Sequence, residues 1–91
     1  MRKAARIDGN HREIRDAFRW CGYVWEDTFR LGEGFPDALV VTKSGTIVLL
    51  EIKMPGEGLT PKERAFHERF KGPLAIVYGV EDAFAKVTKW D

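Results

Sequence analysis

Cysteine is nearly absent from this chain of 91 residues, which contains Cys21 alone, and histidine occurs only twice. One cysteine cannot form a disulfide within the chain, a pattern typical of proteins that stay in a reducing cytoplasm. One cysteine and two well-separated histidines also do not suit a structural zinc site. We therefore expect an ordinary apolar core, with Cys21 as one of its buried side chains.

Long apolar runs are absent as well. No stretch approaches the ~20 residues of a membrane span, and the basic start, Met1–Arg6, is not followed by the apolar region of a signal peptide. We expect a soluble cytoplasmic protein with no membrane partner. At this length the sequence predicts a single domain over residues 1–91, with a modest core that dimerisation would help to stabilise.

The chain also lacks a strong net charge, since its formal charge is only +1. This argues against a protein that binds nucleic acid through bulk positive charge, but local clusters matter more for a phosphate backbone. Alone, such clusters are usually solvated helix faces. Beside a site for phosphodiester chemistry, they predict contacts to the sugar-phosphate backbone. The N-terminal cluster is Arg2, Lys3, Arg6, Arg12, Arg15 and Arg19, and the second is Lys62, Arg64, Arg69 and Lys71.

Two apolar, β-branched runs, residues 35–42 and 46–53, lie on either side of Lys43-Ser44-Gly45. A three-residue loop with glycine last predicts an antiparallel hairpin with a type I turn and a glycine bulge. If Thr42 pairs with Thr46, the two runs align residue by residue toward their far ends. Both faces of the second run are apolar over residues 46–50, so this strand should be central in a sheet covered on both sides.

The same register places Asp37 opposite Glu51, with Cβ atoms roughly 4.5 to 5.5 Å apart. Lys53 lies two residues beyond Glu51, so its side chain points to the same face. Opposed carboxylates are unfavourable unless a cation or a proton compensates them. Hard oxygen ligands favour Mg²⁺ or Mn²⁺, and we expect such an ion here. The alternative is a surface charge cluster without function.

The other elements follow from capping and spacing. A helix is expected from about His11 to Cys21 with Asn10 as its N-cap, then a strand over Tyr23–Phe29 and a loop over Leu31–Gly34. Thr60-Pro61-Lys62-Glu63 predicts a second helix with a capping box, which ends before Gly72-Pro73. A short strand over Leu74–Tyr78 and a helical piece over Glu81–Val87 complete the chain. We expect an α/β fold with helices flanking a mixed sheet.

Three tryptophans, Trp20, Trp25 and Trp90, are expected in the core or an interface rather than as base-stacking platforms. His11 and His67 fall on different predicted helices, and neither accompanies a recognisable serine or cysteine nucleophile. We expect His67 on a helix surface.

Gly34-Phe35-Pro36-Asp37, the strand ending in Glu51-Ile52-Lys53, and Leu59-Thr60-Pro61 at a helix start resemble the virus-type replication-repair nuclease (VRR-NUC) domain of the PD-(D/E)xK superfamily. The resemblance extends from the helix holding Glu13 to the strand near Val77. It implies a restriction-endonuclease-like core with the order αβββαβ. One position departs, because Glu63 stands where this family usually has glutamine.

The resemblance also implies a site. Its catalytic residues would be Asp37, Glu51, Lys53, Glu13 and Glu63, and its metal ligands would be Asp37, Glu51, Glu13 and the backbone carbonyl of Ile52. From the residues alone, the roles of two of these, Glu13 and Glu63, stay open. Glu13 also fits a capping box begun by Asn10, and Glu63 fits the one begun by Thr60 even better.

The function implied is a Mg²⁺- or Mn²⁺-dependent, structure-selective DNA endonuclease. Small stand-alone, phage-like members of this family suggest a homodimer that resolves four-way (Holliday) junctions in a bacterial or phage-infected cell. Two alternatives remain. One is a less selective nuclease for flaps, nicks or single strands. The other is a non-catalytic nucleic-acid-binding module with a degenerate metal site.

Overall fold

The structure of the protein is a computed structural model that describes residues 9–91. Its framework is a four-stranded mixed sheet. In spatial order the strands are β1 (Val24–Asp27), β2 (Ala38–Val41), β3 (Ile47–Ile52) and β4 (Leu74–Val77). β2 runs antiparallel to both β1 and β3, and β4 runs parallel to β3. The predicted α/β class and mixed sheet are confirmed.

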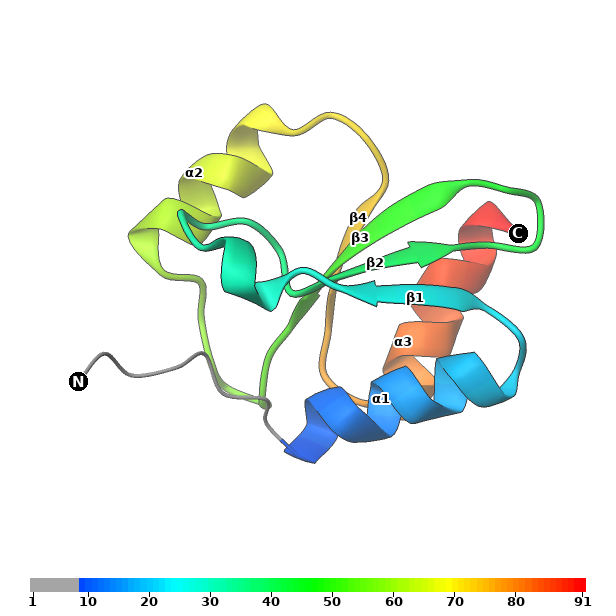
Figure 1. Ribbon diagram of the computed structural model, residues 1–91. Helices are drawn as coiled ribbons and strands as arrows, with labels where there is room; N and C mark the ends of the chain where they lie inside the picture. The colour runs from blue at the N-terminus through cyan, green and yellow to red at the C-terminus, as the bar shows by residue number, and fades with distance from the viewer. Residues whose placement is uncertain (1–8) are drawn as a thin grey trace.

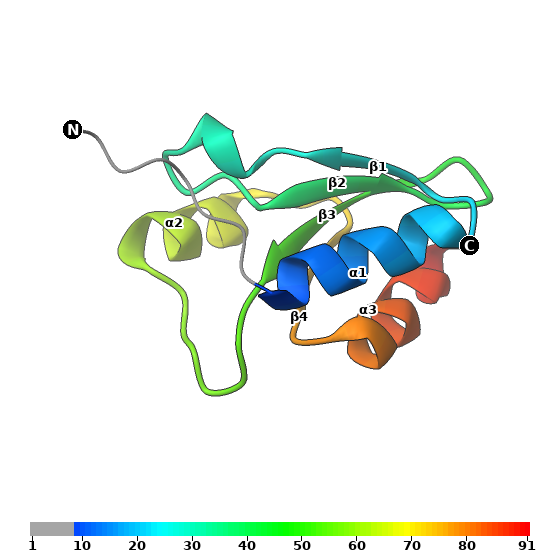
Figure 2. The ribbon, with the colours of Figure 1, turned by 60° about the horizontal axis from the view of Figure 1, so that its bottom comes forward.

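Three helices flank the sheet. Figures 1 and 2 show α1 (Gly9–Trp20) and α3 (Val80–Val87) side by side, whereas α2 (Pro61–Arg69) lies apart from them, at the left of both views. Leu50 and Ile52 of β3 belong to the core that contains α1 and α3 residues. Because side chains alternate along a strand, Glu51 points to the opposite face, where α2 lies.

Within the described residues 9–91, no helix has the length and apolar character needed to cross a membrane.

The β2–β3 hairpin forms in the predicted register. Leu39 pairs with Leu49, and Val41 pairs with Ile47. At the turn, the Thr42 amide donates to the Thr46 carbonyl at 2.8 Å. Gly45 has a φ of 92°, a left-handed conformation that favours glycine, as the bulge requires. This register fixes which side chains of the two strands share a face.

Strand β1 and its following loop differ from expectation. The strand covers Val24–Asp27 rather than Tyr23–Phe29, and a 3₁₀ turn, η1 (Phe29–Leu31), replaces its predicted end. The Thr28 amide donates to the Asp37 carbonyl at 2.8 Å, and the Thr28 hydroxyl donates to the Pro36 carbonyl at 2.8 Å. These bonds close the loop onto the residues just before β2 and end the strand early.

Helix α1 begins at Gly9, so Asn10 lies inside it and is not its cap. Its buried side chains are His11, Ile14 and Phe18, which recur along one face of the helix. These side chains form the inner face of the helix. Cys21 is exposed, so its core assignment is wrong. Trp20 is 90% exposed and lies outside the core, and its place in an interface stays a prediction.

Trp25 is buried, as expected. Trp90, in a final 3₁₀ turn, η2 (Thr88–Trp90), is half-buried and packs against the core.

Helix α2 begins with the predicted capping box. Thr60 is the N-cap, its hydroxyl accepts from the Glu63 amide at 3.2 Å, and the Glu63 carboxylate accepts from the Thr60 amide at 2.9 Å. Gly34 lies directly against this turn. A Cβ atom at Gly34 would come within 2.3 Å of the Lys62 carbonyl oxygen, so only glycine lets the loop before β2 approach α2 this closely.

Phe18 and Trp20 offer a test of the core assignment on a single helix. Phe18 is fully buried and stacks on Phe84 of α3 with ring centroids 4.1 Å apart, whereas Trp20 is solvated. We predict that Phe18→Ala lowers the free energy of unfolding by about 3 to 5 kcal/mol. Trp20→Ala should change it by less than about 0.5 kcal/mol. Urea denaturation measures both, and similar losses for the two variants would contradict this orientation of α1.

Candidate functional site

The Asp37 and Glu51 side chains meet at the end of the β2–β3 hairpin. Continuing the observed register by one pair beyond Ala38 and Leu50 sets the two residues opposite each other. The backbone amide of Ile52 donates to Asp37 Oδ2 at 2.7 Å, which fixes that carboxylate beside β3. Glu51 is only 1% exposed. Two acidic groups thus occupy one largely buried site.

Burial is the main cause that makes the carboxyl groups of this pair weaker acids than usual. Removal from water raises the pKa of Glu51, and the charge of Asp37 raises it further, to about 9. Burial also raises the pKa of Asp37, and this outweighs the bond from the Ile52 amide, which lowers it. Without a cation, the protein therefore holds a proton on this pair at neutral pH.

Lys53 lies on the same side of β3 and is 6% exposed. Its ammonium nitrogen, Nζ, lies 2.8 Å from Glu63 Oε1 and 3.9 Å from Glu57 Oε2. Burial lowers the pKa of Lys53, but the bond to Glu63 and the surrounding carboxylates outweigh it and raise the pKa overall. Lys53 is a firmly protonated cation.

Glu63 joins helix α2 to this lysine. Its Oε1 accepts both from Lys53 and from the Thr60 amide of the capping box. Burial raises the pKa of Glu63, but these bonds and the charge of Lys53 outweigh it and lower the pKa overall. The two roles that the sequence left as alternatives, a helix cap and a site residue, are thus served by one carboxylate oxygen.

His67 belongs to the site, although we expected it on the helix surface. Its Nε2 atom lies 3.1 Å from Glu51 Oε1, and its side chain is 13% exposed. Burial lowers the pKa of His67, so the imidazole is largely neutral at pH 7. One sequence signal was available. His67 follows Glu63 by four residues, and that spacing places both on one face of α2.

Helix α1 contributes less than predicted. Asn10 reaches the site, because its Nδ2 donates to the Lys53 carbonyl at 3.1 Å. His11 is buried against Asp27, with 2.9 Å between Nε2 and Oδ1. Glu13 is exposed. The structure therefore brings together Asp37, Glu51, Lys53 and Glu63, but not Glu13, and it adds His67 and Asn10.

The carboxylate pair suits a divalent cation. Glu51 Oε2 is buried and has no hydrogen-bond partner among the described residues, a costly state for a carboxylate oxygen unless something binds it. No group of three or more His, Cys, Asp or Glu side chains in residues 9–91 is arranged to hold a metal. Mg²⁺ usually takes only one or two carboxylates, with water and substrate oxygens completing its shell. Asp37 and Glu51 fit that pattern.

A cleft of about 490 Å³ opens at the site, between the loop before β2 and the start of α2. Asp37 and Glu63 line it together with Phe35, Gly34 and Lys62. The close approach of Gly34 to α2 therefore also forms one end of this cleft. An extended substrate entering here would meet Asp37, the member of the carboxylate pair that lines the cleft.

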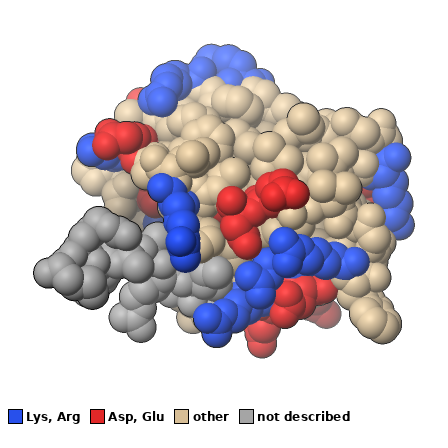
Figure 3. Space-filling view, viewed as in Figure 1, with Lys and Arg blue, Asp and Glu red and all other residues tan. Residues whose placement is uncertain are grey.

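Positive charge lies on both predicted helices. Figure 3 shows Lys and Arg side chains along α1, where Arg12 and Arg19 are exposed and Arg15 pairs with Asp16. On α2, Lys62 pairs with Glu33, and Arg69 lies over the Phe66 ring. Part of each cluster is thus engaged within the protein. Arg2, Lys3 and Arg6 lie outside the described residues.

The raised pKa of Glu51 gives a stability test that needs no substrate. The folded protein binds this proton more tightly than the unfolded chain, in which the pKa is near 4.5. The resulting stability is fully present below pH 4.5 and is lost as the pH rises toward 9. We predict that wild type loses stability over this range in EDTA, and that Glu51→Gln does not. One pKa unit corresponds to about 1.4 kcal/mol, so the melting temperatures of wild type and Glu51→Gln should differ by several degrees at pH 8.

Glu68→Gln, on the exposed surface of α2, is the matched control and should keep the wild-type decline. Saturating Mg²⁺ should flatten the wild-type decline, because the cation replaces the proton. A wild-type stability that is flat or rises between pH 5 and pH 9 in EDTA would contradict a shared proton at this pair.

Comparison with known proteins assigns a family. Residues 9–88, from the start of α1 to the end of α3, match the model of the VRR-NUC domain. Neither the comparison with curated proteins nor that with solved structures gave a significant match. The matched span contains the whole hairpin and helix α2, which supply the carboxylate pair and the residues that hold it. Since this match covers most of the chain, the protein belongs to the VRR-NUC family and is a nuclease.

Proposed function

We propose that this protein is a metal-dependent, structure-selective DNA endonuclease with its active site at Asp37, Glu51 and Lys53. The observation that carries the proposal is the buried carboxylate pair with an unpartnered oxygen, Glu51 Oε2, next to a protonated lysine. A neutralising cation would relieve the repulsion that now keeps a proton on the pair.

Asp37 and Glu51 would hold Mg²⁺ or Mn²⁺, together with the backbone carbonyl of Ile52. When bound, such an ion acts as a Lewis acid toward the phosphoryl oxygens and lowers the pKa of water. Glu13 is exposed on α1, and we propose that it acts through water rather than by direct ligation. The Ile52 amide already fixes Asp37, so β3 supplies both the ligand and its support.

Lys53 has the charge that phosphodiester hydrolysis requires. Negative charge grows on the phosphoryl oxygens during attack, and a preorganised ammonium stabilises it. Because the pKa of Lys53 is raised, this electrostatic role suits it better than removal of a proton from water. Glu63 positions the lysine through the 2.8 Å contact and anchors it to the start of α2.

His67 is proposed as a positioning residue for Glu51. In the tautomer with a proton on Nε2, it donates to Oε1 and leaves Oε2 free for the cation. Hydrogen bonds to metal-binding carboxylates orient them before the metal arrives. Helix α2 thus holds two residues of β3, Lys53 through Glu63 and Glu51 through His67.

The proposed substrate is branched DNA, with the four-way junction as the first candidate. The exposed basic residues of α1 and α2 would contact the sugar-phosphate backbone without reading base sequence. A homodimer would place two sites for paired nicks on opposing strands. We place this activity in the cytoplasm of a bacterial or phage-infected cell.

The decisive assay is Mg²⁺- and Mn²⁺-dependent cleavage of a labelled four-way junction beside linear duplex and single strand. We predict symmetric cuts in the junction, and a loss of at least about 100-fold in rate for Lys53→Ala, because one stabilising charge is removed from the transition state. Junction affinity should change only a few-fold. Lys43→Ala, at the β2–β3 turn, is the control and should cut like wild type.

Cutting of all three substrates at similar rates would replace junction resolution with a less selective nuclease. Binding without any product would instead favour the non-catalytic module. Unchanged cleavage by Lys53→Ala would remove this lysine from the mechanism.

His67 is tested by metal affinity, measured by calorimetry with Mn²⁺ in the absence of DNA. We predict that His67→Phe, which keeps an aromatic ring but loses the donor, weakens binding about 10- to 100-fold. His67→Gln, which keeps a donor, should retain much of the affinity. Equal affinities for wild type and His67→Phe would show that the contact with Glu51 does not prepare the site.

A further inference from the structure

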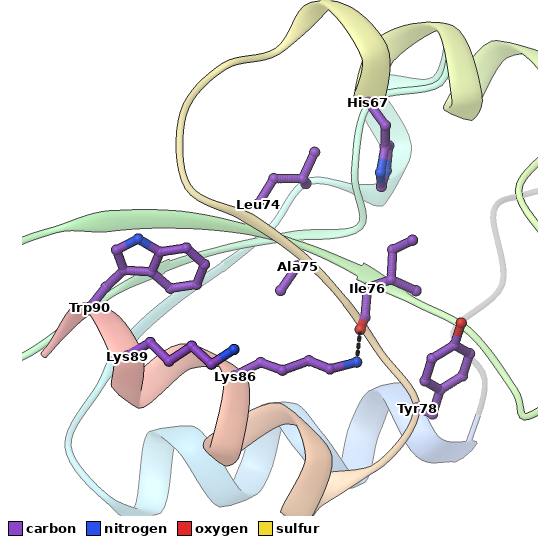
Figure 4. A pocket seen from close by; sticks show the side chains of 8 residues that line it. All are labelled: His67, Leu74, Ala75, Ile76, Tyr78, Lys86, Lys89 and Trp90. Carbon is purple, nitrogen blue, oxygen red and sulfur yellow. Dashed lines mark hydrogen bonds between the residues drawn. The ribbon is translucent and has the colours of Figure 1, made fainter.

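A second groove lies along the outer edge of the sheet, with a volume of about 480 Å³. It crosses β4 between α2 and the C-terminal turn η2. Figure 4 shows His67 at one end and Trp90, Lys89 and Lys86 at the other, with the strand between them. Because His67 also contacts Glu51, the groove begins directly beside the candidate active site.

The chemistry of the groove favours one class of ligand. The charged residues that line it are two lysines, Lys86 and Lys89, and its aromatic residues are Trp90 and Tyr78. Lysines attract phosphates, and aromatic rings stack on bases that are not already paired in a duplex. A volume of this size accommodates individual nucleotides rather than the face of a double helix.

Trp90 is held as a rigid platform. Its backbone carbonyl accepts from the Ser44 hydroxyl at 2.7 Å and from the Thr42 hydroxyl at 3.2 Å. The next residue, Asp91, accepts from the Tyr23 hydroxyl at 2.9 Å. These bonds tie η2 to the β2–β3 turn and to the start of β1. The Trp90 side chain itself packs against the core, so it loses little freedom when a base stacks on it.

A β-strand from another protein fits this edge less well. Lys86 Nζ donates to the outward carbonyl of Ile76 at 2.6 Å, and the Tyr78 amide donates to Asp82 Oδ2 at 3.0 Å. Two of the backbone groups that an added strand would use are therefore already bonded, a common protection of edge strands. A nucleic acid strand needs no such backbone pairing.

We propose that the groove lined by His67, Ile76, Lys89 and Trp90 binds a single strand of the nucleic acid substrate, next to the point of cleavage. The assignment rests on the proposed nuclease function and specifies its substrate, a DNA branch with an unpaired arm or an opened junction. Lys89, which is exposed, contacts phosphate, and Trp90 stacks on a base. Lys86 stays with Asp82, at 3.0 Å, and contributes charge at longer range.

The test is equilibrium binding of a fluorescent twelve-nucleotide oligothymidine in EDTA, where a metal-dependent nuclease does not cut. Lys89→Ala should weaken binding about 3-fold or more and reduce the slope of log affinity against log salt by about 0.7. Lys43→Ala removes the same charge outside the groove and should leave both unchanged. Equal effects of the two variants would overturn the phosphate contact.

Stacking is tested with an abasic strand of the same length. Wild type should bind the strand with bases about 5- to 100-fold more tightly than the abasic strand. Trp90→Leu should lose this preference while still losing affinity on Lys89→Ala. Trp90→Phe, which keeps a smaller ring, should retain part of the preference and guards against a folding defect. A preference that survives in folded Trp90→Leu would overturn the stacking role.

The comparison with blunt duplex completes the design. Duplex binding that matches single-strand binding, with the same sensitivity to Lys89→Ala, would overturn the assignment to a single strand. Failure of the proposed function looks different. In that case Mg²⁺ yields no product, although the groove variants still weaken binding in EDTA. If cleavage is present and the groove variants bind like wild type, the groove proposal alone is wrong.

Discussion

The repulsion between Asp37 and Glu51 is the interaction around which the site is built. The pairing of β2 with β3 brings the two carboxylates together at the end of a strand pair that is otherwise apolar, and burial keeps water from screening them. A folded protein tolerates this only with a bound proton or a bound cation. The nearby groups share that constraint. The Ile52 amide and His67 each hold one carboxylate, and Lys53 supplies positive charge close by.

Helix α2 holds the residues of this site in place. Its residues Glu63 and His67 are one turn apart, about 6 Å along a helix. Lys53 and Glu51 are two residues apart on a strand, which is nearly the same distance. The helix can therefore contact both strand residues at once. The capping box ties Glu63 to the first turn, so the position of the lysine depends on how α2 starts.

Both grooves adjoin helix α2. One opens on Asp37 and Glu63, and the other begins at His67 and follows β4 to Trp90. The proposed path of a substrate strand therefore passes Asp37 in the first groove and His67, which contacts Glu51, in the second. Along such a path, local lysines and arginines would meet the sugar-phosphate backbone even though the net charge of the chain is only +1.

The parts of the structure whose cause is local could be predicted from the sequence. The Lys43-Ser44-Gly45 turn fixed the hairpin register, which set Asp37 opposite Glu51, and Thr60-Pro61 with Glu63 fixed the start of α2. Contacts between distant segments were decided only by the tertiary structure. Ile14 and Phe18 of α1 are buried against the sheet and α3, and this sets how the helix is rotated. In that orientation Trp20 and Cys21 lie in solvent, and Glu13 lies outside the carboxylate pair. The position of α2 against the sheet brings His67 into contact with Glu51. Helical periodicity permits this contact but cannot specify it.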